Sequence, residues 1–320
     1  MGKPKSGTNI FVIIFKSLMI YIKNFLPLSR VMLFPVFGQI IGIFLIFYST
    51  YFFREQYLSK VSGENLQQNL LLILLGLLLL VLPGFLIFIK AFWDYMIVMV
   101  SLNPMIFDIS KKGTFGDFKI YNSSVKLKTN NYVILLLLIT FLWLGILIFP
   151  FLTFFLGAFI NTALIAPIFL AMVLISVIFS IMLSVNISLA FQIFAFESIS
   201  PVEVLKKSCN LMKGNFWRTL SMGIILLLVT TFIIPELFNT FIEKTPFFSY
   251  LIQLFEVFGN IIFKDNIFQY GHLANLKITP FGIAETMAFC TVNVVLTAMM
   301  LPWGSACFTL LYKDILDRKK

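Results

Sequence analysis

The chain is poor in charge and in reactive side chains. Only 12% of its 320 residues are charged, and it holds a single histidine, His272, and three cysteines. It contains no HExxH, GxSxG or Walker A motif, and no GxGxxG after a strand. Cys209, Cys290 and Cys307 are far apart with no CxxC pair, so neither a zinc site nor a disulfide framework is indicated. We therefore expect no enzyme, no metal and no cofactor, and read His272 as a solvated loop residue.

Apolar residues, in contrast, are abundant: they make up 60% of the chain, and the mean hydropathy is +0.98. A transmembrane helix needs roughly 20 predominantly apolar residues. Six stretches are long enough, at 31–53, 70–93, 132–155, 163–196, 219–241 and 282–312. The sequence thus predicts an all-α polytopic membrane protein in which residues 1–320 form a single membrane domain.

The formal charge of +10 raises the question of a nucleic-acid partner. The basic residues are spread over short connections, so we expect anionic phospholipid, not nucleic acid, as the partner. Most of these bases lie before span one, between spans two and three, between spans four and five, and after span six. The positive-inside rule then places both termini in the cytoplasm.

A short pattern recurs before spans one, three and five. A serine precedes an asparagine–aromatic pair by seven residues in each copy, at Ser17 and Asn24, Ser124 and Asn131, and Ser208 and Asn215. This shared register predicts three parallel repeats, residues 10–107, 118–196 and 202–312, each a surface helix followed by two spans. The alternative is three unrelated helices that look alike because helices beside a membrane are commonly basic and aromatic.

The third copy has the clearest surface helix. Ser200 suits the N-cap, Pro201 the first turn, and Glu203 the acid of a capping box. Apolar and basic residues then segregate to opposite faces, as in a helix lying on a membrane surface. We expect the bases to contact lipid phosphates; they are Lys206, Lys207, Lys213 and Arg218.

The second span of each predicted repeat is comparatively polar. Because polar groups are costly in hydrocarbon, these residues predict that spans two, four and six occupy the centre. They include Lys90, Asp94, Asn103, Asn186, Gln192, Glu197 and Asn293. Lys90 and Asp94 lie one helical turn apart, which favours a structural ion pair over a proton or substrate site. Gly38 and Gly42 in span one form a GxxxG pattern for close helix packing.

The connection 242–279 is long and rich in phenylalanine. Phe247, Phe248, Leu251, Leu254, Phe255 and Phe258 share one broad apolar face if the segment is helical. A re-entrant hairpin or a surface helix fits this pattern better than a solvated loop.

The run from Glu197 to Arg218 resembles the membrane domain of glycerophosphodiester phosphodiesterases, which also occurs alone in YciC-like bacterial inner-membrane proteins. Glu197, Ser208, Lys213-Gly214, Phe216-Trp217 and Arg218 carry the resemblance, and Tyr312, Asp314 and Arg318 match the exit of the last helix. Val204 departs from the usual alanine. The resemblance implies a polytopic membrane protein, and the phosphodiesterase barrel of the fused enzymes has no counterpart here.

The interpretation favoured by these observations is a non-enzymatic inner-membrane protein that engages lipids or organises envelope components. Two alternatives stay open at this point. One is a transporter or channel whose path is lined by spans two, four and six. The other is a membrane subunit of a larger assembly, in which exposed phenylalanine faces bind other membrane proteins.

Overall fold

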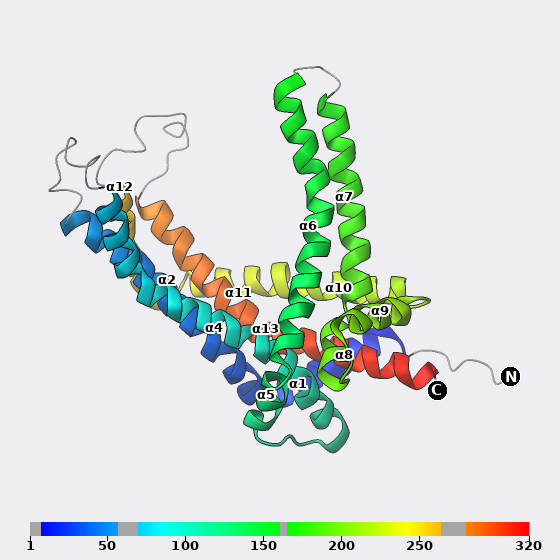
Figure 1. Cartoon of the computed structure of the whole chain (residues 1–320). Helices are drawn as coiled ribbons and strands as arrows, with labels where there is room; N and C mark the ends of the chain where they lie inside the picture. The colour runs from blue at the N-terminus through cyan, green and yellow to red at the C-terminus, as the bar shows by residue number, and fades with distance from the viewer. Residues whose placement is uncertain (1–7, 57–69, 161–164, 264–279, 320) are drawn as a thin grey trace. The chain divides into compact units, whose positions relative to one another are not determined.

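The computed structural model describes residues 8–56, 70–160, 165–263 and 280–319 (Figure 1). These residues are helical almost throughout, and no strand occurs among them. The helices are α1 (Ile10–Lys23), α2 (Phe25–Gln56), α4 (Leu70–Lys112), α5 (Phe118–Lys126), α6 (Thr129–Ile160), α7 (Ile165–Ile187), α8 (Ala190–Phe196), α9 (Pro201–Met212), α10 (Phe216–Leu227), the π-helix η2 (Leu228–Ile233), α11 (Ile234–Ile242), α12 (Pro246–Phe263) and α13 (Pro280–Lys319).

The expected number of spans is confirmed. Six helical stretches are long and apolar enough to cross a membrane: Phe25–Thr50, Leu71–Lys112, Thr129–Phe155, Pro167–Phe196, Phe216–Ile242 and Ala284–Lys319. The sequence expectation ended span two at residue 93, whereas α4 continues unbroken to Lys112. At 1.5 Å per residue its 43 residues measure roughly 65 Å, about twice the hydrocarbon thickness of a bilayer.

Span five departs from a regular α-helix in its middle. Pro235 is the second residue of α11, which directly follows the π-helix η2. A proline has no N–H to donate to the carbonyl four residues earlier, and its ring clashes with that carbonyl. Widening the preceding turn into a π-helix relieves the clash, so the sequence itself explains the irregularity.

The chain divides into two compact units. Unit 1 contains residues 8–23, 99–225 and 303–319 within the described ranges, and unit 2 contains residues 24–98 and 226–302. In unit 1, α6 and α7 lie side by side as an antiparallel pair (Figure 1), and α9 packs against α6, α7 and α8.

In unit 2, α2 and α4 approach each other closely at glycines. A Cβ atom added at Gly38 would lie 2.8 Å from the Cβ atom of Ala91, and one at Gly42 would lie 2.7 Å from the backbone nitrogen of Phe88. The predicted GxxxG patch therefore serves close packing of these two helices.

The long connection 242–279 contains a helix, α12, as its apolar pattern indicated. Phe248, Ile252 and Phe255 of α12 pack against Ala284, Ala288, Val292 and Leu296 of α13. Phe247 and Leu254 of the expected apolar face are exposed instead. Residues 264–279, which include His272, lie outside the described residues.

Candidate functional site: a polar junction in unit 1

The C-terminal parts of α4 and α13 and the short helix α8 meet through three polar side chains. The Asn103 Oδ1 atom accepts hydrogen bonds from Gln192 Nε2 at 3.3 Å and from Thr309 Oγ1 at 3.0 Å. The Asn103 amide donates to the carbonyl oxygens of Met99 and Val100 in its own helix. These three side chains are only 1%, 5% and 1% exposed, and they form a buried polar contact, which we call the polar junction. The Gln192 Oε1 atom is buried without a hydrogen-bond partner among the described residues.

Aromatic rings cover the junction three to four residues further along each helix. Phe107 contacts Phe196 edge to face, with ring centroids 5.2 Å apart, and Phe196 stacks on Tyr312 at 5.7 Å. The Lys313 ammonium lies 5.4 Å from the centre of the Phe107 ring. Residues from the same three helix ends thus contact each other in a second layer, which stabilises their convergence.

A carboxylate follows each junction residue at the same spacing of five positions: Asp108 after Asn103, Glu197 after Gln192, and Asp314 after Thr309. Each is held by hydrogen bonds. The Tyr121 hydroxyl of α5 donates to Asp108 Oδ2 at 2.7 Å, and Lys112 forms an ion pair with Asp108 at 3.3 Å. Burial, together with the bond to Asp108, raises the pKa of Tyr121.

Glu197 is held by two helices. The Lys207 ammonium of α9 lies 2.7 Å from both carboxylate oxygens, and the Tyr312 hydroxyl of α13 donates to Oε1 at 2.8 Å. Lys128, between α5 and α6, donates to the backbone carbonyl of Glu197 at 3.2 Å. That lysine therefore satisfies a carbonyl beyond the end of α8, where the helix leaves such groups without intrahelical partners.

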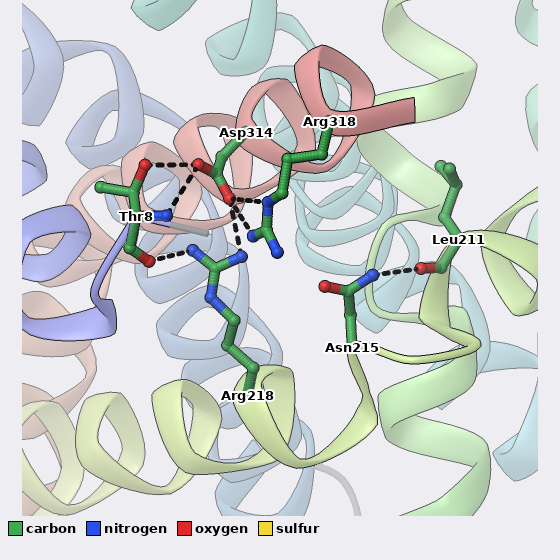
Figure 2. Close-up of polar contacts among 6 residues, drawn as sticks. All are labelled: Thr8, Leu211, Asn215, Arg218, Asp314 and Arg318. Carbon is green, nitrogen blue, oxygen red and sulfur yellow. Dashed lines mark hydrogen bonds and ion pairs between the residues drawn. The ribbon is translucent and has the colours of Figure 1, made fainter. Parts of the chain in front are cut away.

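Asp314 connects α13, α10 and the residues before α1 (Figure 2). It forms an ion pair with Arg218 Nη1 at 2.6 Å, and it also accepts bonds from Arg318 and from the Thr8 hydroxyl. The Arg218 guanidinium donates in addition to the Thr8 carbonyl oxygen. The Arg218 and Asp314 side chains are each 15% exposed, so this ion pair is largely shielded from solvent.

Local signals in the sequence fix α9 in place. Ser200 and Glu203 form the predicted capping box, and Pro201 occupies the first turn. At the other end Gly214 adopts a φ of +81°, which suits the turn into α10 because glycine has no Cβ atom. The Asn215 amide donates to the backbone carbonyl of Leu211 at 3.1 Å (Figure 2).

Two of the three repeated serines are fully buried. Ser208 Oγ donates to the carbonyl oxygen of Asn186 at 2.6 Å, next to the break between α7 and α8. Ser17 Oγ lies 2.7 Å from Cys307 Sγ and accepts a bond from Trp303 Nε1 at 3.2 Å. Ser124 differs, because it is exposed and bonds only within α5. Ser17 thus joins α1 to α13, and Ser208 joins α9 to α7.

The predicted headgroup residues divide into two pairs. Lys207 and Arg218 are engaged with Glu197 and Asp314 as described, whereas Lys206 and Lys213 are exposed. Trp217, in the first turn of α10, is 76% exposed.

Three further polar candidates of the spans, Lys90, Asp94 and Asn293, belong to unit 2. Lys90 pairs with Asp94 at 3.3 Å, and its side chain is 81% exposed, as suits a structural pair on a helix surface. Asn293 is half-buried in unit 2, and its Oδ1 atom has no hydrogen-bond partner within the described part of the chain. We expected spans two, four and six to occupy the interior of the protein. This expectation holds for the parts of α4, α8 and α13 that carry Asn103, Gln192 and Thr309. It does not hold for the apolar stretch of α4, of which only 6% is buried.

Sequence reasoning missed Asp108, Asp314 and Thr309 as partners in one site. The signal that identifies them is the common spacing of five residues between a polar side chain and a carboxylate at the end of each second span. Within the described ranges, histidine, cysteine and carboxylate side chains form no group suited to a metal ion. Comparison with known proteins gave no match: neither a family model, nor a curated protein, nor a solved structure fits this chain.

Proposed function

We propose that this chain is a non-enzymatic protein of the bacterial inner membrane that binds anionic phospholipid headgroups at the corner between α9 and α10, with both termini in the cytoplasm. One observation carries the proposal. Lys207 and Arg218 form ion pairs with Glu197 and Asp314 of the protein itself, whereas Lys206, Lys213 and Trp217 of α9, α10 and the turn between them are exposed. Exposed bases beside a tryptophan fit the charged interface of a membrane.

The same geometry supports a threefold repeat. Polar residues at matching positions of the three second spans bond to one another, and a carboxylate follows each after five residues. Asp108 is held by α5 and Glu197 by α9, the surface helices of the copies that follow. Asp314 of the last copy is held by Thr8, just before α1, so the contacts close in a ring.

The resemblance to the membrane domain of glycerophosphodiester phosphodiesterases agrees with this proposal. Several of the residues that carry it form hydrogen bonds between different helices of unit 1, namely Glu197, Ser208, Arg218, Tyr312 and Asp314. Membership of that family is accordingly part of what we propose.

The two alternatives are less well supported by the contacts. A transport path lined by spans two, four and six needs polar side chains that water can reach, but Asn103, Gln192 and Thr309 are buried and bonded to each other. A subunit of a larger assembly needs an exposed apolar face, and the α6–α7 pair offers one. Lipid chains cover such a face equally well, so it favours no protein partner.

Lipid retention tests the proposal. Each base near the surface contributes about 1 kcal/mol with anionic lipid. Lys206→Gln/Lys213→Gln should therefore weaken the binding of phosphatidylglycerol by roughly tenfold or more, as measured by native mass spectrometry of protein released from nanodiscs.

Two controls make the result specific. Lys206→Arg/Lys213→Arg keeps the charge and should bind as the unaltered protein does. Lys244→Gln removes an exposed base from the turn between α11 and α12, and should leave binding unchanged. Equal phosphatidylglycerol binding by Lys206→Gln/Lys213→Gln and by the unaltered protein would refute the headgroup site.

A further inference from the structure

Unit 2 contains a cavity of about 420 Å³ between α2, α4, α12 and α13. Its walls are mostly apolar and include Ile43, Phe47, Phe88, Phe255, Met287 and Val294. The volume lies within the range of small-molecule sites in proteins. All four helices contribute to it, and Phe255 of α12 stacks on Phe44 of α2 with ring centroids 5.4 Å apart.

The lining of the cavity extends along α2. Gln39 and Phe47 both line it, and eight residues of helix separate them. At 1.5 Å per residue this separation is roughly 12 Å. Because α2 is one of the helices suited to crossing a membrane, this extent of the cavity follows the direction of lipid chains in a bilayer.

One end of the cavity is polar. The Gln39 Nε2 atom is buried and has no hydrogen-bond partner among the described residues. Gly38 lies against Ala91, which places Gln39 at the level of the Lys90–Asp94 ion pair. A charged pair favours the edge of the hydrocarbon, so the unpaired amide lies where the ester groups of lipids are found.

We propose that the cavity holds one acyl chain of a membrane phospholipid, with its ester carbonyl oxygen accepting a hydrogen bond from Gln39 Nε2. The carbonyl supplies the acceptor that the buried amide lacks, and the chain fills the apolar remainder. A bound water is a poorer occupant, because it needs two to four polar partners. The Thr291 hydroxyl also lines the cavity, but it already donates a hydrogen bond to the Met287 carbonyl oxygen.

This acyl-chain site is independent of the headgroup site at α9. It recognises an ester and a hydrocarbon chain, and it should not discriminate between headgroups. The two proposals can therefore fail separately: Lys206→Gln/Lys213→Gln should alter headgroup preference alone, and changes in the cavity should alter ester preference alone.

A matched pair of lipids tests the hydrogen bond. Diester phosphatidylglycerol and its diether analogue share headgroup and chains, but the diether lacks the carbonyl oxygen. One neutral hydrogen bond corresponds to about a fivefold difference in affinity. We therefore expect the unaltered protein to prefer the diester about fivefold when the two lipids compete for binding, as measured by native mass spectrometry. Gln39→Leu should abolish that preference. Equal retention of both lipids by the unaltered protein would overturn the proposed bond.

A second pair of variants tests the position of the chain. Val294→Trp fills the cavity and should lower labelling of the α12 and α13 peptides by a diazirine-bearing acyl chain at least fivefold. Val177→Trp is the control, because Val177 belongs to α7 of unit 1, does not line the cavity, and has an exposure of 50% that matches the 49% of Val294. If the unaltered protein shows no labelling at Phe255 or Met287, the chain does not occupy this cavity.

Discussion

The polar junction and the α6–α7 pair belong to the same unit but are held together by different forces. At the junction three buried polar side chains bond to each other, and three carboxylates bind the helices around them. In the α6–α7 pair, Ser176 donates to the Ile146 carbonyl oxygen at 3.3 Å, and Phe154 contacts Phe169. Most of its other large side chains point outward, with Phe141 66% exposed.

The difference follows from the solvent that surrounds each region. Lipid chains are as apolar as leucine, so apolar side chains gain little by leaving lipid for protein. Polar side chains, in contrast, lose free energy unless they find partners. We infer that the arrangement of the helices in unit 1 is determined by the junction, and that the α6–α7 pair supplies length across the membrane.

The largest effect should come from Asp314→Ala. This change leaves Arg218 and Arg318 side by side without their shared carboxylate, and removal of one partner from a buried ion pair costs about 3–5 kcal/mol. We expect a loss of about 3 kcal/mol in the free energy of unfolding, measured by titration with SDS in mixed micelles.

The neighbouring Asp317→Ala is the matched control. Asp317 has the same charge on the same helix but is exposed, so its replacement should change the free energy of unfolding by less than about 0.5 kcal/mol. Similar losses in both variants would mean that net charge, not the contacts of Asp314, stabilises this region.

A second prediction compares the two regions directly. Asn103→Leu deprives the Gln192 amide and the Thr309 hydroxyl of their common acceptor, which should cost about 2 kcal/mol. Phe141→Ala removes a larger side chain from the α6–α7 pair, yet should cost less than about 0.5 kcal/mol because that ring is mostly exposed. The same SDS titration measures both, and a larger loss for Phe141→Ala would contradict the comparison.

Much of the helical architecture was predictable because apolar length and caps are local properties. The six spans followed from runs of apolar residues, and α9 followed from Ser200, Pro201 and Glu203. The continuation of α4 to Lys112 was not predicted, because Lys90 and Asp94 resemble the end of a span. In the structure they pair on the surface of an unbroken helix.

The site was harder to predict because its members are distant in sequence. Gln192 and Glu197 stood out as polar residues at the end of a span, but their partners Asn103 and Tyr312 are defined by packing. Lys207 and Arg218 looked like lipid contacts, and only the structure places carboxylates against them. Composition indicates which residues are basic, whereas contacts decide which of them stay exposed.

A third prediction concerns the repeated serines. Ser208→Ala leaves the Asn186 carbonyl oxygen without its donor, so we expect a loss of about 1 kcal/mol in the free energy of unfolding. Ser124→Ala, at the matching position of copy two, should have almost no effect because that hydroxyl is exposed and bonds within its own helix. Equal losses in the free energy of unfolding for Ser208→Ala and Ser124→Ala would show that the hydrogen bond from Ser208 to Asn186 is not the source of the stabilisation.

The smallest predicted effect is a pH dependence at the start of α9. The Ser200 backbone N–H donates to Glu203 Oε2 at 3.0 Å, and this bond lowers the pKa of Glu203 below its ordinary value of 4.5. A lowered pKa means that the ionised carboxylate stabilises the folded state above about pH 4.5, and that this stabilisation is lost as the pH falls through the lowered pKa. Glu203→Gln keeps a side-chain acceptor but cannot ionise. The unaltered protein should therefore be more stable than Glu203→Gln at pH 7, and the two should converge below pH 4.5, as measured by thermal unfolding of α9-labelled protein across pH. A difference that stays constant with pH would assign the effect to side-chain shape, because only an ionising group changes its contribution as protons bind.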